Sequence, residues 1–203
     1  MPIFNNISFS AKKSEIIAVK GKNGAGKTSL LHCLAGVIPK HIKSKLTGEV
    51  SYEGNKLYPP ADKCRVFPQY FGLLSQDPDK QICFPYIDEE LLFGAENMCK
   101  DMDSVKKRHQ EMTEIFPFLS SQNGGSPETY NLSFGEKKIL LFASQVIKNP
   151  DIFLLDEPSA GLSGDLLSRM EKLLIGLQKE GKIIVIAEHS NHFDSLTART
   201  LWL

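Results

Sequence analysis

A glycine-rich run near the start of the chain has the composition and spacing of a phosphate-binding loop. Residues 21–28 match the pattern G-x-x-x-x-G-K-[ST] in full, after an apolar stretch and before a helix-like segment. Glycines let successive backbone N–H groups point at phosphate oxygens, and the N-terminus of the next helix adds positive potential there. Lys27 would reach the β- and γ-phosphates, and the Thr28 hydroxyl would ligate Mg²⁺. We expect a nucleotide to be held by Gly21, Lys22, Asn23, Gly24, Ala25, Gly26, Lys27, Thr28 and Ser29.

Two adjacent carboxylates follow a second apolar stretch. Asp156 and Glu157 come directly after residues 152–155, which read as a buried strand. Ligands bind at the carboxyl ends of the strands in open α/β sheets. There, Asp156 could hold Mg²⁺ through its water shell, while Glu157 orients or deprotonates an attacking water. Such pairs often only cap a turn, but beside Lys27 and Thr28 they indicate hydrolysis of the bound nucleotide.

The elements that must position these residues are short strands alternating with helices. Residues 16–19, 152–155 and 183–187 are apolar runs typical of buried strands, and residues 28–35 read as a helix. Leucines recur at helical spacing between the second and third of these strands. This alternation predicts a parallel sheet covered on both faces. Residues 79–131 are acidic, then helical, then loop-like, which predicts a helical insertion.

Length and charge bound the protein as a whole. The 203 residues predict one domain, or one domain with an inserted subdomain. Because 24 basic residues balance 24 acidic ones, binding of nucleic acid by bulk charge is not expected. The charge is unevenly distributed, however: residues 12–56 hold nine lysines against three glutamates, and residues 77–103 hold eight carboxylates against two lysines. These regions are either solvated faces or two opposite functional surfaces.

The chain has no pattern typical of export or membrane insertion. No apolar run approaches about 20 residues, and the N-terminus lacks the features of a signal peptide, so we expect a cytoplasmic location. The four cysteines have neither zinc-ligand spacing nor a dense disulfide pattern, and we expect reduced, mostly buried thiols. They are Cys33, Cys64, Cys83 and Cys99.

Together with the phosphate loop and the carboxylate pair, three further segments resemble motifs of the ATP-binding subunits of ABC transporters. The run Leu132, Ser133, Phe134, Gly135 and Glu136 is similar to the LSGGQ signature. Gln76 matches the glutamine of the Q-loop, residues 159–163 match the D-loop, and His189 matches the switch histidine. The resemblance implies a P-loop NTPase (RecA-like) α/β fold: a parallel-sheet core, a small antiparallel β part and a helical subdomain. We expect one domain over 1–203, with the core at 1–78 and 133–203 and the helical subdomain at 79–132.

The resemblance also implies how the residues act. Glu157, His189 and Gln76 would be catalytic, Thr28, Gln76 and Asp156 would bind Mg²⁺, and ATP would be the nucleotide. The signature would act on the ATP held by a second ATPase subunit, identical or different, so that two chains close around two ATP molecules. From the residues alone, Ser133 with Glu136 is also a capping box at the start of a helix over about 136–148, and both interpretations can hold. A lone histidine such as His189 would otherwise more often be structural.

The acidic segment after Gln76 resembles the Q-loop region of energy-coupling factor (ECF) ATPases. That resemblance implies uptake of a vitamin or a transition-metal ion, with membrane-embedded subunits docking on residues beyond the Q-loop. The chain would then lie on the cytoplasmic face of the cell membrane as a peripheral subunit. Acidic residues there would suit basic helices of such a partner, although a solvated acidic helix has the same composition.

Two departures from the family pattern lead to further expectations. The aromatic residue that usually stacks on adenine would by spacing precede Met1, so we expect weaker or less base-selective nucleotide binding. Ser163 stands where the family usually has Asp, which is expected to loosen coupling between the two sites. The alternatives to a transporter ATPase are a soluble ABC-type ATPase of nucleic-acid or ribosome machinery, and the catalytically slow half of an unequal ATPase pair.

Overall fold

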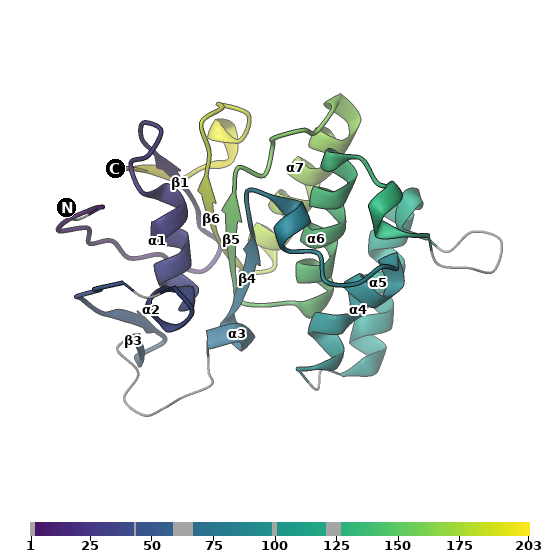
Figure 1. Cartoon of the computed structure of the whole chain (residues 1–203), viewed down its shortest axis with the longest axis horizontal. Coiled ribbons are helices and arrows are strands. Elements are labelled where there is room, and N and C mark those ends of the chain that lie inside the picture. The colour runs from purple at the N-terminus through teal and green to yellow at the C-terminus, as the bar shows by residue number, and fades with distance from the viewer. Residues whose placement is uncertain (1–2, 43, 59–66, 99–100, 121–126) are drawn as a thin grey trace.

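The chain is built on a five-stranded sheet in which every neighbouring pair is parallel (Figure 1). The structure is a computed structural model and describes residues 3–42, 44–58, 67–98, 101–120 and 127–203. The strand order is β4-β5-β6-β1-β7, so the first strand of the chain lies beside the last two. The strands are β1 (Ile16–Lys20), β4 (Phe71–Leu74), β5 (Ile152–Asp156), β6 (Ile183–Ala187) and β7 (Arg199–Trp202).

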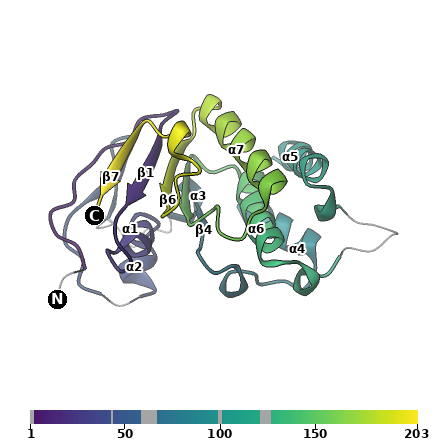
Figure 2. The same ribbon diagram turned by 90° about the horizontal axis from the view of Figure 1, so that it is seen from above.

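The central strands are apolar because both of their faces are covered. Residues of β1, β5 and β6 are buried throughout, as the continuous aliphatic runs predicted. Successive side chains alternate between faces, so Leu154 packs with Leu30 and Leu31 of α1 (Lys27–Leu34), whereas Leu155 packs in a larger cluster with α6 and α7. Figure 2 shows α1 on one side of the strands and α6 and α7 on the other.

Two long helices follow the predicted positions closely. Helix α6 (Phe134–Lys148) begins at the capping box of Ser133 and Glu136 and ends at Asn149, whose φ of 56° is left-handed. Helix α7 (Gly164–Lys179) buries the stripe of leucines and a methionine that the sequence spaced at helical intervals. The predicted α/β fold with a parallel sheet core is therefore confirmed.

The segments between β1 and β5 add the smaller parts of the fold. Strands β2 (Val50–Tyr52) and β3 (Asn55–Tyr58) form an antiparallel pair, as the family resemblance implied. Short helices α2 (Val37–Lys40) and α3 (Phe67–Tyr70) flank that pair in the chain. Helices α4 (Ile87–Glu96) and α5 (Met102–Ile115) lie together at one end of the molecule and pack on α6 (Figure 1). The division into a core and a helical subdomain remains a prediction.

The cysteines depart in part from expectation. Cys33 is buried in α1, and burial raises the pKa of its thiol, whereas Cys83 is exposed. Cys64 and Cys99 lie outside the described residues.

Within the described part of the chain, no helix is long and apolar enough to span a membrane.

Candidate functional site

The phosphate loop joins the buried end of β1 to the start of α1. Gly24 and Gly26 have φ of 79° and 99°, a left-handed backbone that favours glycine. At Gly26 an added Cβ would also lie 2.6 Å from the Ile3 side chain, so the space is restricted as well. Lys22 and Asn23 are exposed, whereas Gly21, Ala25 and Ser29 are half-buried. The loop thus has the backbone curl that its composition predicted.

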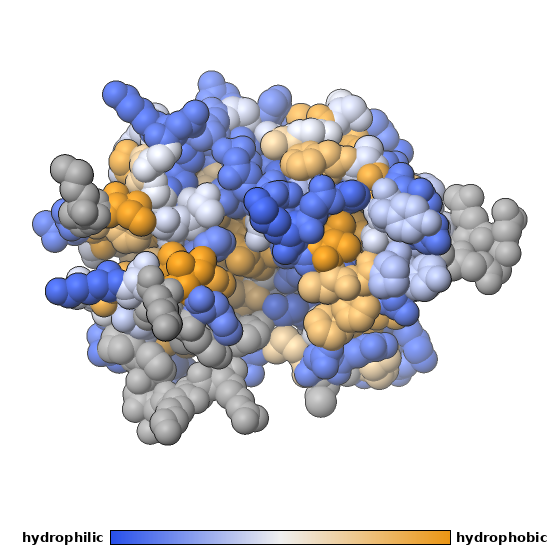
Figure 3. Space-filling view, viewed as in Figure 1, coloured by the Kyte–Doolittle hydropathy of each residue, from blue (hydrophilic) through white to orange (hydrophobic). Residues whose placement is uncertain are grey.

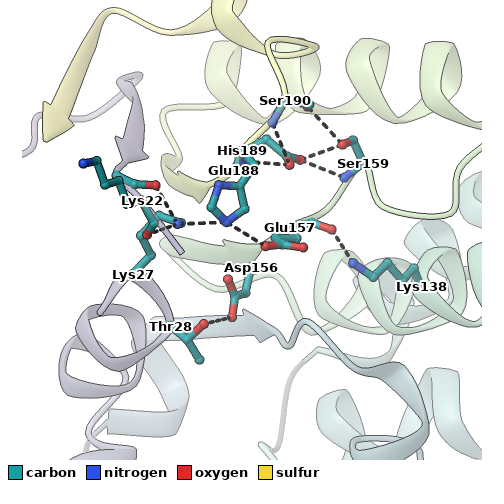
Figure 4. A network of polar contacts seen from close by, with 11 residues as sticks. Lys22, Lys27, Thr28, Lys138, Asp156, Glu157, Ser159, Glu188, His189 and Ser190 are labelled. Atoms are coloured by element: carbon teal, nitrogen blue, oxygen red, sulfur yellow. Dashed lines mark hydrogen bonds and ion pairs between the residues drawn. The ribbon is translucent and has the colours of Figure 1, made fainter. Parts of the chain in front are cut away.

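Lys27 lies at the loop with its side chain turned back over it. Although charged, it is only 6% exposed. Its Nζ donates to the carbonyl oxygens of Gly21 at 3.0 Å and Lys22 at 3.3 Å, and lies 3.0 Å from His189 Nε2 (Figure 4). An anion bound in the loop would be a stronger partner for this ammonium than a neutral carbonyl.

Thr28 and Asp156 meet across the edge of the sheet. The Thr28 hydroxyl donates to Asp156 Oδ2 at 2.7 Å. Asp156 is 3% exposed, and this burial raises its pKa, against the lowering effect of the hydrogen bond from Thr28. A hydroxyl and a carboxylate at the end of a phosphate loop fit Mg²⁺, which is usually bound by one or two carboxylates, waters and substrate phosphates. The described residues contain no group of three or more His, Cys, Asp or Glu side chains that would hold a metal by themselves.

Glu157 has an unusual backbone and is fixed from two sides. Its φ of 46° lies in the left-handed region, which is uncommon for a non-glycine residue and occurs often at functional sites. Its N–H donates to the carbonyl of Ala187 at 2.7 Å, and its own carbonyl accepts from the Nζ of Lys138. The Glu157 carboxylate is thereby directed toward His189, with 3.3 Å between Oε1 and Nε2.

His189 therefore bridges the phosphate loop and the carboxylate pair. Its Nε2 is within reach of both Lys27 and Glu157, while its side chain remains 40% exposed. Figure 4 shows Lys27 and Thr28 at the start of α1 converging with Asp156 and Glu157 at the end of β5 and with His189 after β6. This convergence is the arrangement that the sequence predicted for a nucleotide site.

Gln76 has no direct contact with this group among the hydrogen bonds and ion pairs of the described residues. It follows β4, is exposed, and forms no hydrogen bond with the other predicted site residues in the described structure. The neighbouring Gln81 fixes this loop instead, accepting from the N–H of Ser75 at 2.8 Å and donating to the carbonyl of Leu73 at 2.7 Å. A catalytic and metal-binding role for Gln76 stays a prediction.

The signature residues do not contact the phosphate loop of the same chain: among the described residues, no hydrogen bond joins the two segments. Glu136 Oε2 accepts from the N–H and hydroxyl of Ser133 at 2.9 and 2.6 Å, so the capping box is confirmed. Phe134 and Ser133 are exposed, Leu132 is half-buried, and Gly135 is buried. The buried Gly135 packs closely on Gly161 of the predicted D-loop.

Two charged residues near the site are absent from the sequence-based assignment. Lys138 is fully buried, and burial lowers its pKa against the raising effect of nearby carboxylates. Glu188 is 5% exposed and accepts hydrogen bonds from two loops. Burial of a charge cannot be read from residue type, although a carboxylate directly before His189 was visible in the sequence.

Comparison with known proteins shows the family. The ABC transporter family model matches residues 4–160. The energy-coupling factor transporter ATP-binding protein EcfA of Methanococcus maripaludis is 31% identical, over 98% of this chain and 69% of its own length. A relative from Sulfurisphaera tokodaii, provisionally named an ABC transporter ATP-binding protein, is 37% identical over 90% of this chain.

A solved structure supports the same assignment. The structure of cbiO1 from Clostridium perfringens, described as part of the ABC transporter complex cbiONQ, matches with a TM-score of 0.70 and 30% identity. The match covers 93% of this chain and 72% of that one. The chain spans 37% of the length of the Sulfurisphaera tokodaii relative, and 63% and 62% of two further curated relatives, so these are longer proteins. The chain therefore belongs to the ABC transporter family.

Proposed function

We propose that this chain binds MgATP and hydrolyses it to energise a membrane importer, of the ECF type for a vitamin or a transition-metal ion. The observation that carries the proposal is the convergence of Lys27, Thr28, Asp156, Glu157 and His189 at one sheet edge (Figure 4). Relatives named as energy-coupling factor ATP-binding proteins support the type of transporter.

In the proposed mechanism the phosphate loop and Lys27 bind the ATP phosphates by charge-assisted hydrogen bonds. Thr28 and Asp156, with Gln76, would hold Mg²⁺, which supplies charge neutralisation at the phosphates. Glu157 would orient the attacking water and accept its proton, and His189 would donate to the γ-phosphate. The contacts among Lys27, Thr28, Asp156, Glu157 and His189 support these roles.

The signature would act in a second subunit. Leu132, Ser133, Phe134, Gly135 and Glu136 lie at the start of α6, where the side chains of Ser133 and Phe134 are exposed. Helix N-termini favour anions, so a phosphate of the opposite subunit fits there. ATP would thus close a dimer, of two identical or two different chains, and hydrolysis would reopen it.

The segment after the Q-loop is proposed to dock the transmembrane subunits. The side chains of Tyr86 and Phe93 are 43% and 49% exposed, and the ring of Phe93 lies 4.8 Å from that of Phe84. Half-buried Asp88 and exposed Glu89 lie in the first turn of α4 beside them, whereas Glu90 of the same turn is buried and accepts from the N–H groups of Cys83 and Phe84. Figure 3 shows hydrophobic side chains gathered among hydrophilic ones on the part of the face where α4 lies. An apolar surface with acidic neighbours suits basic, amphipathic helices at the cytoplasmic face of the membrane.

Purification from native membranes tests the proposal. We expect a tagged chain to copurify, after detergent solubilisation, with integral membrane proteins and an ATPase subunit, and the complex to turn over ATP. Recovery with nucleic acid or ribosomes in a salt-sensitive manner would instead support the soluble alternative. Absence of both ATP turnover and membrane partners would contradict the proposal.

A further inference from the structure

Glu188 is a buried carboxylate that the proposed chemistry leaves without a role. It follows directly on β6 and precedes His189. One oxygen, Oε1, accepts from the N–H groups of His189 at 3.0 Å and Ser190 at 3.3 Å. The other, Oε2, accepts from the N–H of Ser159 at 3.2 Å and from its hydroxyl at 2.7 Å (Figure 4).

These four hydrogen bonds join two different loops through one side chain. Ser159 is two residues beyond Glu157, in the loop between β5 and α7, while His189 and Ser190 belong to the loop after β6. Burying a carboxylate costs free energy unless donors replace its water, and here each oxygen has two. No ion pair within 4.0 Å involves Glu188 in the described part of the chain; the loop donors stabilise its charge, together with Lys138 at longer range, whose pKa Glu188 acts to raise. A carboxylate held in this way fixes both loops in one relative position.

Lys20 of β1 also anchors the loop after β6, which carries His189. Lys20 donates from Nζ to the carbonyl of Ser190 at 3.0 Å and to Asn191 Oδ1 at 2.9 Å, and pairs with Asp194 at 2.6 Å. The loop of Ser159 has no such contact with Lys20. The hydroxyls of Ser159 and Ser190, 3.2 Å apart, also join the two loops. Glu188 contributes four further hydrogen bonds to this junction, and one of them comes from the N–H of His189 itself.

We propose that Glu188 is a positioning residue. It holds His189 in a fixed position relative to Glu157, and it couples the loop that carries His189 to the D-loop. Two acceptor atoms facing opposite loops are required, and only a carboxylate of this length provides them. In Glu188→Gln the amide nitrogen would face the N–H donors of one loop in either orientation. In Glu188→Asp the shorter side chain would reach one loop but not both.

The inference rests on the proposed ATPase activity, and its test compares Glu188→Gln, His189→Ala and the double variant in the assembled complex. Glu188→Gln should lower kcat by about tenfold or more with KM for ATP within about twofold of wild type, because the phosphate loop is not touched. If Glu188 acts through His189, kcat of the double variant should lie within about twofold of kcat of His189→Ala. The inference would be overturned if the loss of kcat in the double variant equalled the product of the losses in the two single variants, or if kcat were unchanged in Glu188→Gln. A wild-type complex without ATP turnover would contradict the proposed function instead.

Two further variants separate positioning from a general loss of folding. Glu15→Gln is the matched control: Glu15 accepts from the N–H of Lys12 at 2.7 Å and pairs with Arg199 at 2.7 Å, at the opposite end of β1. It should leave kcat unchanged. Ser159→Ala removes the hydroxyl that donates to Glu188 and lies 3.2 Å from that of Ser190, without touching the carboxylate. It should lower kcat by about threefold at constant KM even if Glu188 variants fail to fold. Wild-type kcat in Ser159→Ala, or equal losses in Glu15→Gln, would overturn the inference.

Discussion

Lys138 links the signature helix to Glu157 through a buried amine. Its Nζ donates to the Glu157 carbonyl and lies 5.6 Å from the centroid of the Phe134 ring. The hydrogen bond compensates part of the desolvation of the ammonium, and it holds the left-handed backbone at Glu157. A residue next to the signature thus fixes the backbone of the proposed general base.

Lys138→Met should change the pH dependence of stability. Because burial lowers the pKa of Lys138 below the unfolded value of 10.5, the unfolded state binds more protons between the two pKa values. The free energy of unfolding of the wild type, relative to Lys138→Met, should therefore rise as pH increases through this alkaline range. Urea denaturation at several pH values up to 10.5 measures the difference. The substitution of exposed Lys179 by Met is the control. If the free energy of unfolding of the wild type, relative to Lys138→Met, fell with increasing pH, the lowered pKa of Lys138 would be contradicted.

At the residue scale, the sequence predicted which side chains come together better than it predicted their individual contacts. Lys27, Thr28, Asp156 and Glu157 come together because strand ends meet at one edge, which alternation alone implied. Glu188 could not be predicted, because its role depends on two loops that are distant in sequence. Gln76 was assigned through its match to the Q-loop glutamine of the family, and its contacts depend on a loop conformation that residue types do not determine.

Among the elements, the first turn of α6 packs closely against the backbone of the D-loop. An added Cβ on Gly135 would overlap the carbonyl oxygen of Gly161, which belongs to backbone that cannot move as a side chain does. Gly161 in turn has φ of 78° and faces the Phe134 ring. Gly135, the glycine of the signature in this chain, is thus required by packing inside the chain, besides any role toward a second subunit.

Gly135→Ala should destabilise the protein by about 1–3 kcal/mol, because the methyl group forces this contact apart. Gly176→Ala is the matched control: Gly176 also lies in a helix, and a Cβ there would meet nothing within 4 Å. That control should be neutral or stabilising by up to about 1 kcal/mol. Chemical denaturation measures both, and equal stabilities for the two variants would contradict the packing argument.

Element positions followed the sequence pattern closely, while element ends followed local caps. The helix expected over about 136–148 starts at Phe134, because the Ser133 hydroxyl and Glu136 carboxylate cap its first turn. The antiparallel pair of β2 and β3 was implied only by family resemblance, because its strands are short and half-exposed. Periodicity is a weak signal in such strands.

For the whole molecule, the zero net charge combines two oppositely charged regions. The lysine-rich segment of residues 12–56 includes the phosphate loop, and the acidic segment of residues 77–103 includes α4. In the fold these segments lie at different ends of the molecule (Figure 1). Opposite charge thus marks the proposed ATP site and the proposed membrane-partner site.

Glu89→Lys should weaken recovery of the membrane subunits. Glu89 is exposed in the first turn of α4, so its replacement reverses charge on the proposed docking surface without disturbing the core. The yield of copurified membrane protein should fall several-fold and depend more strongly on salt. Exposed Glu111→Lys on α5, outside the acidic segment, should leave the yield unchanged. Equal yields from both variants would contradict docking on this surface.

The central claim is that this chain hydrolyses ATP with Glu157 as the group that activates water. Glu157→Gln keeps the size of the side chain and the phosphate loop, and removes the carboxylate that lies 3.3 Å from His189. In the complex purified from membranes, the variant should bind ATP as tightly as wild type while kcat falls roughly 10²-fold or more. An unchanged kcat in Glu157→Gln, with loss of turnover on the equivalent change in the partner ATPase, would contradict the account and make this chain the regulatory half of the pair.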